Sequence, residues 1–210
     1  MFKVNIKTRL TNQLKERSTI WCISYKYISY KGKMKKTLAI ILLIIAFLII
    51  YFLQANFFNW FTIAGVKPNF FIVFILFISL YAGVKVGIPF GVISGLFLDI
   101  ILGKNLGTYG IMFGIIGIIG GYFDKNFSKE SKITIILMVI GSTFIFEIGS
   151  YIIQIIEQSI NVEIMDFIRI LLIEAMYNTI LTIIFYPLIQ KLGYKVEETF
   201  KVQRILTRYF

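Results

Sequence analysis

Long apolar runs separated by short polar segments dominate the hydrophobic pattern of this 210-residue chain. A transmembrane helix needs about 20 mostly apolar residues, because the hydrocarbon core is about 30 Å thick and each residue advances about 1.5 Å. Six such stretches follow Lys36, and they predict helices at about Thr37–Phe58, Pro68–Ala82, Val86–Leu102, Leu106–Tyr122, Ile133–Ile156 and Asp166–Ile189. We therefore expect an all-α integral membrane protein of about six transmembrane helices, with one membrane domain over residues 34–192.

The ends of two of these helices carry signals of their own. The first apolar run is longer than the core of a typical signal peptide and lacks a small-x-small cleavage site, so we expect a retained anchor. Pro68 is expected to open the second helix, since proline in a first turn gives up an amide that has no intrahelical partner.

Lysine and arginine alternate between the two sides of the predicted bundle. Positively charged loops stay in the cytoplasm. With the N-terminus inside, the cytoplasmic side holds the ten basic residues before Thr37 and also Lys85, Lys125, Lys129, Lys132, Lys191, Lys195, Lys201, Arg204 and Arg208. The outer side holds only Lys67, Lys104 and Arg169. This asymmetry predicts cytoplasmic N- and C-termini, and the net charge of +11 suits anionic lipid headgroups better than nucleic acid.

The flanks of the membrane domain are basic. Residues 1–33 contain no apolar stretch long enough to span a membrane, and our hypothesis is that translation begins at Met34, the preceding residues coming from an over-extended reading frame. Residues 193–210 form a basic tail. A helical Lys195–Phe210 would separate apolar and basic faces, as in an interfacial amphipathic helix. A disordered basic tail is the open alternative.

The composition excludes most of the common enzyme mechanisms. The chain has no histidine and a single cysteine, Cys22. Disulfide frameworks, Cys/His zinc sites and mechanisms with an imidazole base are therefore excluded. We expect no catalytic residues, no metal site and no cofactor.

Glycines recur every four residues between the second and fourth predicted helices, and the one slot without glycine holds Asp99. Within lipid, small residues at this spacing allow close helix packing. The pattern comprises Gly83, Gly87, Gly91, Gly95, Gly103 and Gly107, with a second series at Gly110, Gly114, Gly117 and Gly121. Packing within the chain and contact with a partner are both consistent with it. Asp99 needs a partner or a wet cavity, because a carboxylate within a span costs about 2.5–3.5 kcal/mol.

Two further acids, Glu147 and Glu174, lie deeper in the predicted helices, with Asn178 one turn from Glu174. At about 1.5 Å per residue, both carboxyl groups fall roughly 12–15 Å from the outer helix ends. A polar intramembrane site is one interpretation. A single interhelical hydrogen bond between a protonated pair is the other.

These motifs together resemble a known family. The run of Pro68-Asn69, the glycine series, Gly95-Leu96 followed by Asp99, Leu106-Gly107 and a late Tyr186-Pro187 is similar to the MreD family of bacterial rod-shape-determining membrane proteins. The resemblance covers roughly residues 34–192, and residues 1–33 depart from the family pattern. It implies a multi-pass protein of the bacterial cytoplasmic membrane and a fold like that of the six-helix substrate-binding subunits of energy-coupling-factor vitamin transporters.

The resemblance also implies a function without catalysis. MreD proteins work in cell elongation and peptidoglycan synthesis with MreC, the actin-like MreB, the glycosyltransferase RodA and a transpeptidase penicillin-binding protein. We expect a subunit that docks an MreC-like partner through intramembrane helix faces. The candidate helix-packing or partner-binding residues are Pro68, Asn69, Gly83, Gly87, Gly91, Gly95, Asp99, Leu106 and Gly107.

The alternative is a substrate-binding subunit of a vitamin transporter, with a small molecule near Glu147, Glu174 and Asn178. The sequence shows no distinct polar cluster beyond these three residues, which disfavours a solute site. A lipid-modifying enzyme is disfavoured further, since histidine and paired carboxylates at a recognisable catalytic spacing are both missing.

Overall fold

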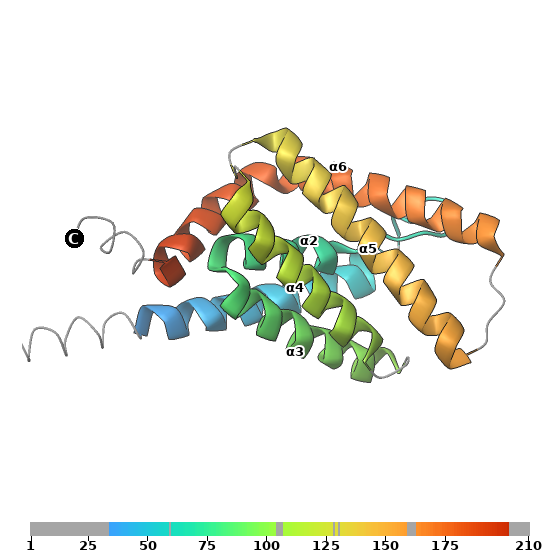
Figure 1. Cartoon of the computed structure of the whole chain (residues 1–210), viewed down its shortest axis with the longest axis horizontal. Coiled ribbons are helices and arrows are strands. Elements are labelled where there is room, and N and C mark those ends of the chain that lie inside the picture. Colours follow the sequence, from blue (N-terminus) through green and yellow to red (C-terminus); the bar gives the residue numbers. More distant parts are fainter. Residues whose placement is uncertain are drawn as a thin grey trace, which may run out of the picture. The chain divides into compact units, whose positions relative to one another are not determined.

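The structure is a computed structural model that describes residues 34–58, 60–103, 107–127, 129, 131–158 and 163–201. These residues form six helices (Figure 1). The N-terminal helix, Met34–Phe57, ends in the π-helical turn η1 (Leu53–Phe57), and the others are α2 (Phe70–Ala82), α3 (Val84–Leu102), α4 (Thr108–Asn126), α5 (Lys132–Gln158) and α6 (Ile164–Lys201). The expected all-helical class is confirmed. The chain divides between Leu42 and Leu43, and the contacts below are those of the unit from Leu43 onward.

Several helix ends differ from the sequence-based prediction, and α4, for example, ends at Asn126 and not near Tyr122. Helix α2 begins at Phe70 with Asn69 as its N-cap, so Pro68 precedes the helix instead of occupying its first turn. Helix α6 continues through Pro187 to Lys201, beyond the expected end near Ile189. The first part of the proposed tail helix is therefore helical, whereas residues 202–210 and the 1–33 extension lie outside the described residues.

Four helices are long and apolar enough to cross a membrane: Met34–Phe57, Val84–Leu102, Lys132–Glu157 and Ile164–Lys201. The apolar helices Phe70–Ala82 and Thr108–Asp124 are shorter. Helix α2, with 13 residues, is about 20 Å long, which is less than the hydrocarbon thickness. Its side chains are buried on nearly every face, as expected for a helix surrounded by protein.

Helix α2 forms the centre of the hydrophobic core. Ile72, Ile75 and Leu76 of α2 are at most 1% exposed, and they belong to one cluster with Phe113 of α4 and Val139 of α5. Helix α2 packs against α3, α4, α5 and α6. In Figure 1, α3 and α4 run side by side, and α5 and α6 follow as the next pair.

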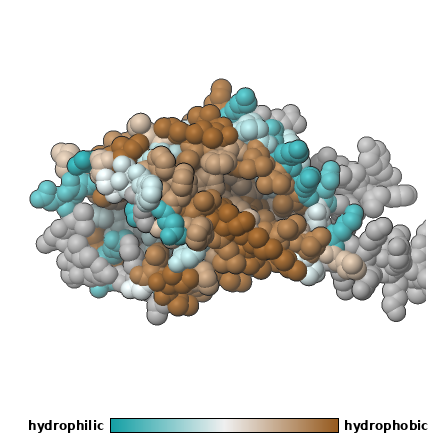
Figure 2. Space-filling view, turned by 180° about the vertical axis from the view of Figure 1, so that it is seen from behind, coloured by the Kyte–Doolittle hydropathy of each residue, from teal (hydrophilic) through white to brown (hydrophobic). Residues whose placement is uncertain are grey.

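The surface between the helix ends is largely apolar. Figure 2 shows hydrophobic residues across the middle of one face and hydrophilic residues towards its ends. Ile93 of α3, Leu137 of α5 and Ile156 of α5 are 68%, 63% and 75% exposed. So extensive an apolar surface is stable in lipid but aggregates in water.

Candidate functional site

The glycine face of α3 lies against other helices of the same chain. A Cβ placed on Gly91 would lie 2.9 Å from the Phe113 carbonyl carbon, and one on Gly95 would lie 2.6 Å from the Gly110 Cα, both in α4. A Cβ on Gly87 would meet the Cα of Ser79, in α2, at 2.7 Å. The Ser79 hydroxyl donates a hydrogen bond to the carbonyl of Gly117. These glycines therefore allow direct contact between helix backbones.

Asp99 lies at the end of this face, where it caps the next helix. It is fully buried. Its Oδ2 accepts the amide protons of Gly107 at 3.0 Å and Gly110 at 3.1 Å, and its Oδ1 accepts that of Tyr109 at 3.0 Å. The first amides of a helix have no intrahelical acceptor. The N-cap of α4 is Gly107, which has no side chain, so Asp99 supplies the missing acceptor.

Two further glycines of the series form turns. Gly83, between α2 and α3, has φ +86°, and Gly107, before α4, has φ +107°. Other residues seldom adopt positive φ values, so glycine is favoured at both turns. Leu106, also among the candidates, lies outside the described residues.

The Pro68-Asn69 pair is held by side chains from two other helices. The Gln54 Nε2 donates to the Pro68 carbonyl at 3.0 Å, and the Gln54 Oε1 accepts the Phe70 amide proton at 3.2 Å. Asn178 Oδ1 accepts the Asn69 amide proton at 2.8 Å. Together these bonds fix the entry to α2. Sequence reasoning missed Gln54, although it is the first strongly polar residue after the long apolar run of the first helix.

The two deep acids and Asn178 come together at this end of the bundle. Glu174 is 7% exposed, and its side chain interacts with those of Glu147, Asn69 and Asn178. Asn178 is fully buried and its Nδ2 donates to the Thr143 hydroxyl at 3.1 Å. Asn178 thus links α6 to α5 and to the start of α2.

A cavity of about 530 Å³ adjoins these acids. Its wall contains Glu147 and Glu174 together with Gln54, Lys67, Asn69, Thr108, Tyr109, Ser150 and Gln154. The sequence had indicated no polar cluster beyond Glu147, Glu174 and Asn178, and that expectation is wrong. The additional residues come from four separate segments of the chain, which only the fold brings together.

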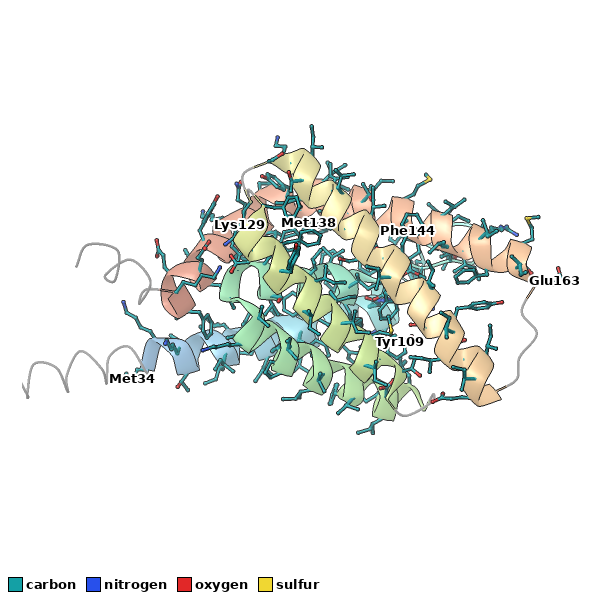
Figure 3. All side chains as sticks on the ribbon, in the orientation of Figure 1. Met34, Tyr109, Lys129, Met138, Phe144 and Glu163 are labelled. Atoms are coloured by element: carbon teal, nitrogen blue, oxygen red, sulfur yellow. The ribbon has the colours of Figure 1, made fainter. Side chains whose placement is uncertain are left out.

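A charged cluster lies at the opposite end of the helices. Asp124 Oδ1 lies 2.6 Å from the Lys129 Nζ and 2.5 Å from the Lys201 Nζ. Glu197 Oε1 lies 2.6 Å from the Lys129 Nζ. Lys129, labelled in Figure 3, follows α4 and reaches towards α6, with its ammonium group 5.4 Å from the Tyr81 ring centroid. The sequence had marked Lys129 and Lys201 only as charges that set orientation.

Burial lowers the pKa of Lys129, but its hydrogen bonds to Asp124 and Glu197 outweigh burial, so the pKa is raised above its usual value. The charged form is therefore favoured in the folded state. The cluster ties α4, the segment after it and the end of α6 together. Among the described residues, no group of three or more histidine, cysteine or acidic side chains is arranged to hold a metal ion.

Apolar helices, close glycine contacts and buried side-chain caps together define a multi-pass helical membrane protein. The chain belongs to the rod shape-determining protein MreD family, whose sequence profile matches residues 34–196. The resemblance seen in the sequence is thus confirmed. Members of this family determine cell shape and are not enzymes. Comparison with curated proteins gave no match, and comparison with solved structures gave none either.

Proposed function

We propose that the chain is a subunit of the bacterial cell-elongation complex that binds an MreC-like protein through its intramembrane helix faces. Through that partner it would act with MreB, RodA and a transpeptidase penicillin-binding protein in peptidoglycan synthesis. The observation that carries the proposal is the family match over residues 34–196, which spans the helices. Helix faces are the main surface that these residues offer to a partner.

The glycine face is occupied by the chain itself, so we place the partner elsewhere on α3. A second helix could reach the backbone of Gly91 or Gly95 only if α3 and α4 separated, because α4 is already in contact there. The opposite side of α3 carries Ile93 and Ile100, which are 68% and 69% exposed. In lipid, helices associate through shape and van der Waals packing, which a stiff face of β-branched side chains favours.

The N-terminal helix extends this face. Phe97 of α3 packs against the rings of Phe47 and Tyr51 at centroid distances of 5.9 and 6.5 Å. These contacts hold the part of the N-terminal helix from Leu43 onward beside α3. We therefore propose that the transmembrane helix of the MreC-like partner packs along Ile93 and Ile100, next to the N-terminal helix.

Co-purification and complementation test this surface. Ile93→Trp combined with Ile100→Trp adds bulk to the proposed face, and we expect about a tenfold loss of co-purified MreC-like protein, with loss of rod shape in a strain that depends on the variant. The control is Leu137→Trp, at an equally exposed position of α5. Equal partner recovery and normal rods for both variants would refute the placement.

In this proposal the glycine face of α3 and Asp99 fix the position of α3. Asp99→Ala and Gly95→Leu should therefore weaken both folding and MreC association. Intact MreC association and rod shape in both variants would refute the proposal that the chain acts by binding an MreC-like protein.

The proposal also includes an orientation, with both termini in the cytoplasm. The Asp124–Lys129 end would then face the cytoplasm and the Pro68–Asn69 end the outside. In a Cys22→Ser background, a membrane-impermeant maleimide added to intact cells should label Glu157→Cys but not Lys195→Cys. Labelling of Lys195→Cys alone would reverse the orientation.

A further inference from the structure

The cavity beside Glu147 and Glu174 has the size of a small-molecule site. Its volume of about 530 Å³ lies within the range of roughly 300–1,000 Å³ that such sites occupy. The wall is built by η1, the segment before α2, the first turn of α4, and helices α5 and α6. In Figure 3, Tyr109 lies between the start of α4 and α5, beside this cavity.

Buried polar atoms in the wall lack hydrogen-bond partners. Among the described residues, these atoms are Glu174 Oε1, Asn69 Oδ1, Ser150 Oγ and Thr108 Oγ1. Glu174, Ser150 and Thr108 are 7%, 6% and 5% exposed, and all three line the cavity. Buried polar groups in native proteins almost always have a partner, so a cluster of four without one calls for an explanation.

The chemistry of these atoms indicates which kind of ligand would match them. A carboxyl carbonyl oxygen and an amide oxygen accept hydrogen bonds, and hydroxyl groups can do so as well. The wall also carries two carboxyl groups, of Glu147 and Glu174, against one ammonium group, of Lys67. An occupant with several N–H donors and a positive charge matches this wall better than an anion does.

Aromatic rings complete the site. Tyr109 and Phe146 both line the cavity, with ring centroids 5.7 Å apart. Aromatic faces attract cations and cover apolar groups. A carboxyl group and two aromatic rings in one cavity wall are thus suited to an ammonium group on an organic skeleton.

We propose that this cavity binds a small organic cation, whose ammonium group donates hydrogen bonds to Glu174 and lies near the Tyr109 and Phe146 rings. The proposal is independent of MreC docking, because the cavity wall includes none of the exposed α3 residues. It assigns the deep acids of α5 and α6 to a ligand site.

Binding to the purified full chain tests the proposal. The chain is reconstituted in phosphatidylcholine nanodiscs, which carry no net negative lipid charge, and titrated calorimetrically with three primary amines, phenethylamine, cadaverine and butylamine. We expect at least one of these cations to bind with a Kd below about 10 mM and to raise the unfolding temperature. No binding by any of the three at that concentration would overturn the proposal. So would equal binding of neutral phenethyl alcohol and phenethylamine.

Matched variants locate the binding. Glu174→Gln keeps the size of the side chain and should weaken the affinity for the cation about tenfold or more. The control Glu157→Gln removes an exposed acid of α5 that does not line the cavity, and it should leave the affinity unchanged. Equal loss in both variants would overturn the assignment to this cavity, as would full affinity in Glu174→Gln.

Charge-selective labelling provides a second readout. In a Cys22→Ser background, Ser150→Cys places a thiol in the cavity wall. After correction for intrinsic reactivity, we expect it to react about tenfold faster with aminoethyl methanethiosulfonate than with the sulfonatoethyl reagent. Glu157→Cys, outside the cavity, should show a smaller preference. A preference for the anionic reagent at Ser150→Cys would contradict a cation site.

Discussion

The carboxylate of Asp99, in α3, accepts the backbone amide proton of Gly110, in α4, at 3.1 Å. This bond depends on the neighbouring glycine, because a Cβ on Gly95 would lie 2.6 Å from the Cα of Gly110. The two helices are therefore close enough for an acid on one to cap the other. The glycine spacing brings the helices together, and the buried acid then caps α4.

Removal of the Asp99 carboxylate should destabilise the fold. In Asp99→Ala three amides of the first turn of α4 lose their acceptor. Since each unsatisfied buried donor costs about 1–3 kcal/mol, we expect a loss of roughly 3 kcal/mol or more. Asp99→Asn keeps one acceptor oxygen and should lose less. Unfolding in mixed micelles by increasing dodecyl sulfate measures both, and the exposed Glu157→Gln is the control. Equal stability of all three variants would contradict the capping role.

Alanine substitutions separate the packed glycines from an open one. Gly95→Ala forces α3 and α4 apart and should cost roughly 1–3 kcal/mol. Gly141, within α5, has nothing within 4 Å of an added Cβ, so Gly141→Ala should stabilise the helix by about 0.5–1 kcal/mol. The same unfolding assay gives both values. A greater loss for Gly141→Ala than for Gly95→Ala would show that the close contact does not matter.

Asn178 is expected to control the entry to α2. In Asn178→Ala the Asn69 amide loses its acceptor, which should cost about 1–3 kcal/mol. Thr179→Val, whose hydroxyl bonds within its own helix turn, is the control and should change stability by less than about 0.5 kcal/mol. An equal effect of Asn178→Ala and Thr179→Val would argue against the Asn69 bond.

The charge cluster of Asp124, Lys129, Glu197 and Lys201 should contribute measurably to stability. Asp124 contacts both Lys129 and Lys201, and its side chain is 9% exposed. Asp124→Ala should therefore cost roughly 1–3 kcal/mol, between the values for exposed and buried ion pairs. A double-mutant cycle with Lys129→Met isolates the pair, and additive losses would exclude coupling.

Within this cluster, the contribution of Lys129 has a pH dependence of defined sign. Because the pKa of Lys129 is raised in the folded state, its contribution is fully present below the usual lysine pKa of about 10.4 and is lost as pH rises through the raised value. Unfolding between pH 8 and pH 11, roughly the range that brackets that pKa, should thus show a steeper alkaline decline for the natural chain than for Lys129→Met. Parallel curves would contradict this.

Most of the fold could be predicted from the apolar runs. Their lengths indicated the six helices and nearly all their bounds, because lipid requires internally hydrogen-bonded helices. Pro68 misled the prediction at α2, since Gln54 and Asn178 hold the chain in a non-helical entry there. Helix α6 also continues past its expected end near Ile189, to Lys201.

The site was predictable only in part. A buried acid at Asp99 implied a partner, but not that the partner would be three amides of the next helix. The cavity was missed, because Gln54, Lys67, Thr108 and Ser150 are unremarkable singly and lie in different segments.

The sequence by itself determined the membrane class, the family and the close approach implied by glycines at every fourth position, because these depend on local composition and helical period. Only the tertiary structure decided what the glycine face contacts, which amides Asp99 caps and which polar residues surround Glu174. Each of these depends on the relative placement of helices. One helix can present the same glycine face to its own chain or to a partner, and only the fold distinguishes the two.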